Sequence, residues 1–253
     1  MNDMVLETRA ILETRDLHMA FGGLVIFDCM NFALRRGERH AIIGPNGAGK
    51  TTFVSLVTGL LKPKSGNVFL DGRIITNDTP QQRVKAGMVR TFQINSLFKA
   101  LNPLESVVLA LLERDNKARL SLRSVSAETE LIDEAMALLT QFDLARDAYG
   151  LTEALPYGKQ RLLEIVLAVA LRPKLLLLDE PAAGLSTQQG HEVFSQLAHL
   201  SKDTAILFIE HDMNLVFRYA DVVSVFAAGA LVMQDTPENV RKSPRVREVY
   251  LGN

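Results

Sequence analysis

Short runs of hydrophobic residues fill the first third of the chain and predict β-strands. Residues 4–21 and 24–43 contain such runs, which turns interrupt at 22–23 and 36–37. The second range ends in RHAIIG, which indicates a strand that leads into a glycine-rich loop. Residues 50–60 then show helical spacing that ends at Gly59, and NVFLDG predicts a further strand.

From about residue 95 to residue 172 the hydrophobic spacing becomes that of helices, in VVLALLER, AETELIDEAMALLTQF and RLLEIVLAVAL. Two strand-like runs follow, KLLLLDE and AILFIEH, with a helix near 187–201 between them. The tail predicts short strands in DVVSVFAAGALVM and a charged helix over PENVRKSPRVREVYL. Unbroken apolar strands are typical of a parallel sheet with both faces buried. The pattern therefore predicts an α/β protein with a mostly parallel core sheet and a helical insertion.

Composition narrows the class of protein. The 253 residues are 47% hydrophobic and 23% charged with a formal net charge of −1, and the basic residues are spread along the chain, which favours an ordinary globular protein without a nucleic-acid partner. The single cysteine, Cys29, excludes an internal disulfide and a cysteine-based metal cluster. We expect no signal peptide and no membrane span, because the apolar runs are shorter than the roughly 20 residues that a spanning helix needs. Any membrane role must then go through a partner.

A phosphate-binding motif follows the RHAII run. GPNGAGKT matches G-x-x-x-x-G-K-[ST] in full, after a predicted strand and before a predicted helix, which is the context that the mechanism requires. Backbone N–H groups of the loop and the helix N-terminus can face a polyphosphate. Lys50 can reach the β- and γ-phosphates, and the Thr51 hydroxyl can hold Mg²⁺. The predicted binding residues are Gly44, Pro45, Asn46, Gly47, Ala48, Gly49, Lys50 and Thr51.

Polar residues end three apolar runs. Asp179 and Glu180 close KLLLLDE, where the first can hold Mg²⁺ and the second can activate a water molecule. Gln93 ends MVRTFQ and His211 ends AILFIEH. In an open parallel sheet such positions face the crevice where ligands bind. We therefore predict that Gln93 orients water or contacts Mg²⁺, and that His211 donates to a γ-phosphate; a surface glutamine and a core histidine are the alternatives.

The phosphate loop, Gln93, residues 155–160, LLLLDEP and His211 occur in the order found in the ATPase domain of ABC transporters, a family that the chain resembles over essentially its whole length. FGGLVIFD, VRTFQINSLF, LPYGKQRLLEI, LLLLDEPAAGLS and VREVYLGN are similar to the ATPase subunits of branched-chain amino acid importers. The resemblance implies ATP hydrolysis with ATP and Mg²⁺ (Mg2+) as cofactors. It also implies one ABC ATPase domain of P-loop NTPase fold over residues 1–253.

The resemblance further implies a division within that domain. Residues 1–94 and 173–253 would form the nucleotide-binding core with an N-terminal antiparallel β subdomain, and residues 95–172 the helical signature subdomain. Two ATPase domains of this family dock head to tail, and the signature segment of one covers the ATP that the other binds.

The signature segment corresponds here to residues 155–159. Tyr157 and Gly158 match the tyrosine–glycine signature of the amino acid importers, and a helix that starts here can turn its N–H groups and Lys159 toward a phosphate. Pro156 removes the hydroxyl and the N–H of the usual serine, and Lys159 replaces a glutamine. The alternative is a plain helix start.

Further positions are carried over by the same resemblance. Phe21 matches the aromatic residue that stacks on adenine, although a core phenylalanine is the alternative. Thr52 would bond the α-phosphate. Leu167 stands where an arginine is often found, and Ser186 stands where aspartate or asparagine is common in the loop that signals across the dimer.

The segment INSLFKALNPLESVV is more apolar than an exposed loop requires, at Leu97, Phe98, Leu101 and Pro103. In the family this region forms the groove that receives a cytoplasmic helix of an integral-membrane permease subunit. A small satellite core beneath the helical insertion is the alternative.

The resemblance thus implies a cytoplasmic subunit, peripheral at the inner face of the cell membrane, that pairs with an identical or related second ATPase subunit. The expected cargo is a branched-chain amino acid or a related small polar solute, with urea, short amides and aromatic acids as alternatives. A soluble ABC ATPase of nucleic-acid metabolism is less favoured, since the sequence contains no long coiled-coil insertion, zinc hook or second ATPase domain. The tyrosine–glycine signature and the VREVYLGN tail disfavour an exporter subunit.

Overall fold

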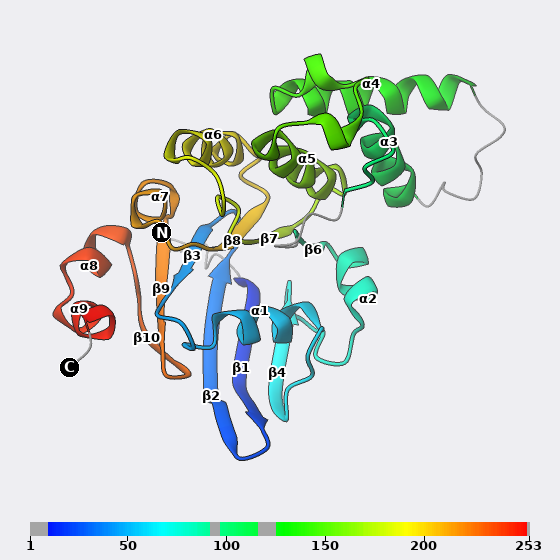
Figure 1. Cartoon of the computed structure of the whole chain (residues 1–253). Coiled ribbons are helices and arrows are strands. Elements are labelled where there is room, and N and C mark those ends of the chain that lie inside the picture. Colours follow the sequence, from blue (N-terminus) through cyan, green and yellow to red (C-terminus); the bar gives the residue numbers. More distant parts are fainter. Residues whose placement is uncertain (1–9, 92–96, 116–124, 252–253) are drawn as a thin grey trace, which may run out of the picture. The chain divides into compact units, whose positions relative to one another are not determined.

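The computed structural model describes residues 10–91, 97–115 and 125–251 and contains two compact units (Figure 1). The first unit comprises Met1–Met88, Lys174–Glu180 and Ser201–Asn253, and the second comprises Val89–Pro173 and Pro181–Leu200. Strands dominate the first unit, and helices dominate the second.

The strands form two sheets, with the orders β2-β1-β4-β5 and β10-β9-β3-β8-β7-β6. Their bounds are Ala10–Phe21 (β1), Leu24–Arg35 (β2), Arg39–Ile43 (β3), Ser65–Leu70 (β4), Arg73–Ile74 (β5), Met88–Arg90 (β6), Leu175–Asp179 (β7), Ala205–Ile209 (β8), Val222–Ala227 (β9) and Ala230–Asp235 (β10). The first sheet is antiparallel, whereas β7, β8, β3 and β9 run parallel in the second. The predicted α/β class is therefore confirmed, with its antiparallel N-terminal part and its mostly parallel core sheet.

Helix α1 (Lys50–Thr58) follows β3 and packs its Phe53 against both sheets of the first unit. The ring of Phe53 lies 5.0 Å from that of Phe32 on β2 and 5.2 Å from that of Phe226 on β9, centroid to centroid. Such edge-to-face pairs fix the helix against the strands. The helix ends at Gly59, where the pattern predicted its end, because φ is 80° there and glycine adopts that conformation without strain.

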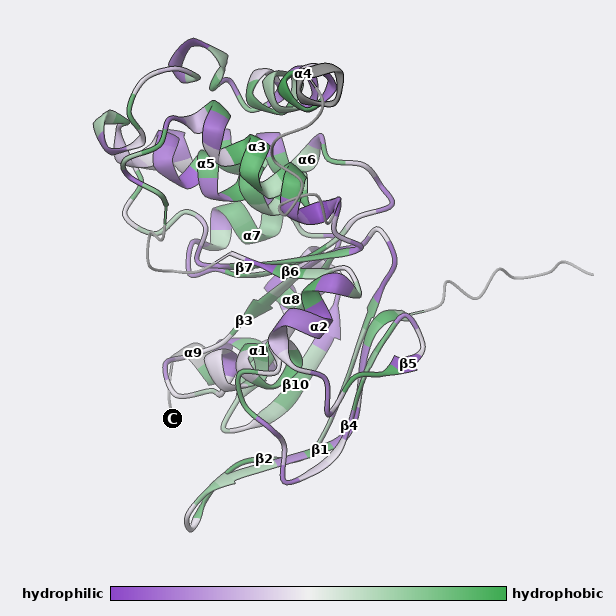
Figure 2. Ribbon diagram, turned by 90° about the vertical axis from the view of Figure 1, so that its right-hand side faces the viewer, coloured by the Kyte–Doolittle hydropathy of each residue, from purple (hydrophilic) through white to green (hydrophobic). Residues whose placement is uncertain are grey.

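A second helix of this unit, α2 (Pro80–Lys85), is one that the hydrophobic pattern missed because the helix is short and polar, as Figure 2 shows. Its sequence signal is a capping box, in which Thr79 and Gln82 bond each other's backbone N–H groups. The helix carries Arg83, whose side chain is 1% exposed and donates to the carbonyl oxygens of Leu56 and Val57 at the end of α1.

Three helices follow β8: α7 (Met213–Tyr219), α8 (Pro237–Lys242) and α9 (Pro244–Leu251). The prediction of one charged helix over residues 237–251 was wrong, because Ser243 is extended between α8 and α9, with ψ at 121°. The residue before a proline is pushed out of the helical region, and Pro244 does so here.

The second unit is mostly helical. Its helices are α3 (Pro103–Arg114), α4 (Val125–Gln141), α5 (Tyr157–Ala170) and α6 (Thr187–Ala198), with short 3-10 turns η1 (Ala145–Asp147) and η2 (Thr152–Ala154). Arg114 at the end of α3 holds Glu134 of α4 at 2.6 Å and also donates to the carbonyl oxygen of Ala170 on α5. Figure 2 shows α3 as largely hydrophobic. No helix in the described ranges is long and apolar enough to span a membrane.

Candidate functional site

The candidate site lies in the first unit, at the carboxyl ends of three neighbouring strands. β8 runs between β3 and β7, and Ile209 of β8 is paired with Ile42 on one side and with Asp179 on the other. The backbone N–H of Glu180 donates to the carbonyl oxygen of Ile209 at 3.0 Å. The residues that follow these three strands are therefore brought to one edge of the sheet, where ligands bind in open α/β folds.

Glycines give the phosphate loop its shape. The φ angle is 154° at Gly44 and 99° at Gly49. A Cβ atom added at Gly44 would lie 2.1 Å from the carbonyl oxygen of Phe226, and one added at Gly49 would lie 2.8 Å from Cζ of Phe27. Only glycine therefore fits these two positions, and the loop backbone is held close against the sheet.

Several other residues of the phosphate loop are exposed to solvent. Asn46, Gly47 and Thr51 are exposed and Thr52 is half-buried, at the start of α1, whereas Ala48 is buried. The N-cap of α1 is Gly49, with no side-chain cap. The first N–H groups of the helix thus remain available to an anion, as the motif predicts.

Lys50 lies inside this loop, 8% exposed. Its Nζ donates to the carbonyl oxygens of Gly44 at 2.6 Å and of Pro45 at 3.0 Å. Burial lowers the pKa of the Lys50 ammonium, and the charges of Glu180 and Asp179 oppose that effect. The two carboxylates are thus close enough to Lys50 to act on it electrostatically, although β8 separates their strand from β3.

The acidic pair and the histidine meet at the same edge. Asp179 ends β7 at 6% exposure, and Glu180 follows with φ at 49°, a conformation that costs about 1 kcal/mol or more for a residue with a side chain. His211 Nε2 lies 3.1 Å from Glu180 Oε1. Strained backbone conformations are common at functional sites.

Glu210 is a residue of the site that sequence reasoning missed. It is 5% exposed at the end of β8, and its Oε2 accepts a hydrogen bond from the backbone N–H of His211 at 3.0 Å. The signal was a second polar residue in the run FIEH, directly before the histidine. The Glu210 carboxylate helps to fix the backbone that carries His211.

Two further predicted residues are Phe21 and Gln93. Phe21 is 49% exposed at the end of β1, so it is not the core phenylalanine of the alternative interpretation. Gln93 lies outside the described residues, and its predicted role stays a prediction.

The signature segment, residues 155–159, opens α5 in the second unit with Pro156 at the N-cap. The Lys159 ammonium, predicted to lie beside a phosphate, pairs with Oδ2 of Asp147 at 2.6 Å. The ring of Tyr157 covers Gly184, where an added Cβ would lie 3.2 Å from Cε1 of the ring.

Gly158 packs against the start of α6 and the loop before it. A Cβ at Gly158 would lie 3.1 Å from Nε2 of Gln189, and Gln189 forms a capping box with Ser186. The serine thus keeps the capping role that aspartate or asparagine can also fill. The signature segment and the Ser186 loop consequently share one packing contact.

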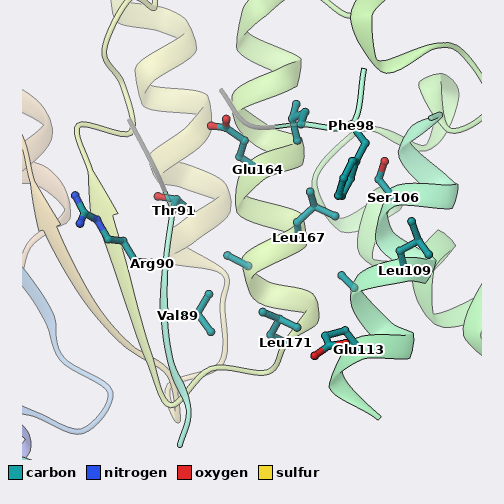
Figure 3. Close-up of a pocket in the computed structure, with 13 residues that line it drawn as sticks. Val89, Arg90, Thr91, Phe98, Ser106, Leu109, Glu113, Glu164, Leu167 and Leu171 are labelled. Carbon is teal, nitrogen blue, oxygen red and sulfur yellow. The ribbon is translucent and has the colours of Figure 1, made fainter. Parts of the chain in front are cut away.

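The apolar region after Gln93 contains both buried and exposed residues. Leu97 is buried, Phe98 is 61% exposed and Leu101 is half-buried. Leu97 and Phe98, but not Leu101, line a pocket of about 600 Å³ together with residues of β6, α3 and α5 (Figure 3). This pocket lies entirely within the second unit.

Comparisons with known proteins agree with this geometry. The family model described as ABC transporter matches residues 27–183. The chain is 36% identical to the "High-affinity branched-chain amino acid transport ATP-binding protein LivG" of Salmonella typhimurium, over 97% of this chain and 99% of the relative. It is 33% identical to the "Probable branched-chain amino acid transport ATP-binding protein LivG" of Archaeoglobus fulgidus, over 96% and 95% respectively.

Solved structures give the same result. The crystal structure of an ATP-binding cassette of an ABC transporter in its ADP conformation superposes with a TM-score of 0.83 at 29% identity, covering 97% of this chain and 100% of that one. The cbiO1 protein of Clostridium perfringens, part of an ABC transporter complex, superposes with a TM-score of 0.80 at 26% identity, covering 96% and 95%.

Proposed function

We propose that this chain, which belongs to the ABC transporter family of ATP-binding subunits, hydrolyses ATP to power the import of branched-chain amino acids or a related small polar solute through separate membrane subunits. The names of the relatives support the cargo class. The observation that carries the proposal is the meeting of Lys50, Glu180 and His211 at one edge of the parallel sheet.

The loop fits a nucleoside triphosphate. Its backbone is free of side chains at Gly44 and Gly49, and the buried Lys50 ammonium has only neutral carbonyl oxygens as hydrogen-bond acceptors within the loop. A polyphosphate would supply anionic acceptors in their place. The β- and γ-phosphates belong beside Lys50, the α-phosphate beside Thr52, and the adenine against the exposed ring of Phe21.

The site also fits Mg²⁺, which prefers oxygen ligands and keeps several waters. Thr51 offers a hydroxyl at the start of α1, Asp179 offers a carboxylate at the end of β7, and Gln93 is the third predicted ligand. The described part of the chain contains no cluster of three or more His, Cys, Asp or Glu side chains that could hold a metal ion. In this proposal the ion would be held by the oxygens of Thr51, Asp179 and Gln93 together with phosphate and water. When bound it supplies neutralisation of the phosphate charge.

Hydrolysis then follows from the roles of two side chains. Glu180 accepts the proton of the attacking water, which is a general-base role. His211 holds the Glu180 carboxylate in place and can donate a hydrogen bond to the γ-phosphate. Lys50 and the loop N–H groups position the phosphates, so that most of the rate enhancement comes from positioning and charge neutralisation.

The full site requires a second ATPase subunit, identical or related, docked head to tail. Tyr157, Gly158 and Lys159 of one subunit would cover the nucleotide of the other, and Lys159 would first have to exchange its contact with Asp147. We further propose that residues 1–253 form a single ABC ATPase domain. Its nucleotide-binding core would comprise residues 1–94 and 173–253, and its signature subdomain residues 95–172. The permease subunits would bind the groove near Leu97, Phe98 and Leu101, and the chain would then lie at the cytoplasmic face of the membrane.

Uptake measurements test this function. Deletion of the gene from its host should abolish most of the high-affinity uptake of radiolabelled leucine, and the wild-type chain should restore it. The Glu180→Gln variant, expressed at the same level, should not restore uptake, since it keeps the shape of the site but lacks the base. Restoration of uptake by Glu180→Gln would contradict the proposal, and a defect confined to labelled urea would move the cargo to another class.

A further inference from the structure

Lys159, in the first turn of α5, is held by a carboxylate from outside that helix. Its Nζ lies 2.6 Å from Oδ2 of Asp147, which ends the 3-10 turn η1, and both residues belong to the second unit. The two side chains are 39% and 24% exposed, so solvent screens this ion pair only in part. Lys159 is the only cation in the sequence of residues 155–159, and in this structure its ammonium is engaged within its own chain.

The end of α5 that carries Lys159 favours a negative charge. Pro156 is the N-cap and provides no side-chain cap, and the first turn of the helix contains no acidic residue. The N–H groups and the dipole of such a helix end attract an anion. Asp147 supplies that anion from η1, so it gives Lys159 the kind of partner that a phosphate of ATP would otherwise be.

The backbone that carries Asp147 is held in place by hydrogen bonds. The carbonyl oxygen of Asp147 accepts from the N–H of Gly150 at 3.1 Å. The next residue, Ala148, is buried, and its carbonyl oxygen accepts from the N–H of Leu104 on α3 at 3.1 Å. Lys159 reaches Asp147 through a flexible four-carbon side chain. When the ion pair opens, the lysine is therefore the partner that moves.

The composition of the signature segment increases the importance of this lysine. Pro156 offers a ligand neither a hydroxyl nor a backbone N–H. In the head-to-tail dimer, Lys159 is then the one cation that residues 155–159 bring to the γ-phosphate bound by the other subunit. A carboxylate and a phosphate beside the same ammonium repel each other. The two anions consequently compete for Lys159.

We propose that Asp147 is an internal competitor of ATP, which weakens the ATP-bound dimer by holding Lys159 in the free subunit. The inference rests on the proposed function, and it makes Asp147 a positioning residue that acts through Lys159. A dimer of two copies opens two such ion pairs when it closes. Each partly exposed pair corresponds to roughly threefold in an equilibrium constant, so the two together raise the dissociation constant of the dimer about tenfold.

Removal of the carboxylate tests this role. The parent is the full chain with Glu180→Gln, and its dimer dissociation constant is measured by light scattering over a range of protein concentrations in Mg²⁺ and ATP. Added Asp147→Asn, or Asp147→Ser as a second variant, should lower the constant about tenfold, a gain that misfolding cannot produce. Glu153→Gln removes the same charge from an exposed position on η2 and should leave the constant within about twofold. No decrease in either Asp147 variant, or an equal decrease in Glu153→Gln, would overturn the proposal.

A double-mutant cycle separates this role from a structural one. With Lys159→Gln in place, Asp147→Asn should change the dissociation constant by no more than about twofold, because the carboxylate then has no cation to hold. An undiminished gain in the Lys159→Gln background would overturn the role of Asp147. Binding of a fluorescent ATP analogue to each variant is measured in parallel. Variants that all bind the analogue and never dimerise would contradict the head-to-tail dimer of the proposed function and this inference with it, whereas dimers of unchanged affinity would contradict the role of Asp147 alone.

Discussion

His211 Nε2 lies 3.1 Å from Oε1 of Glu180, although 31 positions separate the two residues in the sequence. The contact joins the carboxyl ends of β8 and β7, which are neighbours in the sheet. It holds the carboxylate near Lys50, whose pKa both acidic residues at this edge influence. A base held in this way loses less conformational freedom when it acts on a water molecule, so each partner of the contact should be necessary for hydrolysis.

Replacement of the histidine tests that relationship. His211→Ala should lower kcat for ATP hydrolysis by about 10²-fold or more, with a small change in the Kd for ATP, because general-base catalysis typically contributes this much. Phosphate release and nucleotide binding are measured on the same preparation. His18→Ala is the matched control, since His18 makes a comparable histidine–carboxylate contact of 3.2 Å with Asp28 on β2. Equal losses in both variants would contradict the assignment.

Lys50 should dominate nucleotide affinity. Lys50→Ala removes an ammonium that is held by two loop carbonyls, and we expect affinity for a fluorescent ATP analogue to fall roughly 10–100-fold, which corresponds to about 1.5–3 kcal/mol for a charged hydrogen bond. Lys62→Ala, at an exposed position after α1, should bind ATP as the wild type does. Wild-type affinity in Lys50→Ala would contradict the assignment of this loop to nucleotide binding.

Arg83 should stabilise the first unit. Its guanidinium donates to four carbonyl oxygens, those of Leu56, Val57, Thr76 and Asp78, and burial lowers its pKa. Arg83→Met leaves these acceptors unpaired and should lower the free energy of unfolding by about 3 kcal/mol, measured with urea. Arg73→Met, at an exposed residue that pairs with Asp78, should change it by no more than about 0.5 kcal/mol. Similar effects of the two substitutions would show that the buried hydrogen bonds of Arg83 do not account for its contribution to the free energy of unfolding.

Low pH should destabilise the second unit, because it protonates Glu134. The hydrogen bond from Arg114, with a smaller contribution from Arg172, lowers the pKa of Glu134 below its ordinary value of 4.5, against the opposing effect of burial. The ion pair therefore stabilises the fold fully above pH 4.5, and this contribution is lost as the pH falls through the lower pKa of the folded state.

For a carboxylate that is partly screened by solvent, the loss amounts to no more than about 1 kcal/mol. Glu134→Gln should thus destabilise the unit at neutral pH and flatten its acid dependence, followed by circular dichroism. Glu153→Gln, at an exposed site in η2, serves as the control. An acid dependence in Glu134→Gln as steep as that of the wild type would exclude this residue as the source.

Much of the fold and part of the site could be predicted because the signals are local. The phosphate loop has a fixed spacing, the apolar runs of β7 and β8 require a buried parallel sheet, and Gly59 marks the end of α1. The break at Ser243 was equally local and was missed, since the charged pattern continues through it.

Other features depend on contacts between distant segments, which no single stretch reveals. The place of β3 between β8 and β9 brings His211 to the loop, and only the sheet order shows it. The pairing of Lys159 with Asp147 depends on how η1 packs beside α5.

The central claim is that residues 155–159 form a working signature that closes an ATP-bound dimer. It is tested most directly by the mass of the Glu180→Gln variant, measured by light scattering in Mg²⁺ and ATP and again without nucleotide. We predict a shift from 28.0 kDa to twice that mass, which disappears when Gly158→Asp is added and persists with Gly150→Asp, an exposed glycine near the same helix. A chain that binds ATP and stays at 28.0 kDa, or a dimer that survives Gly158→Asp, would contradict the account.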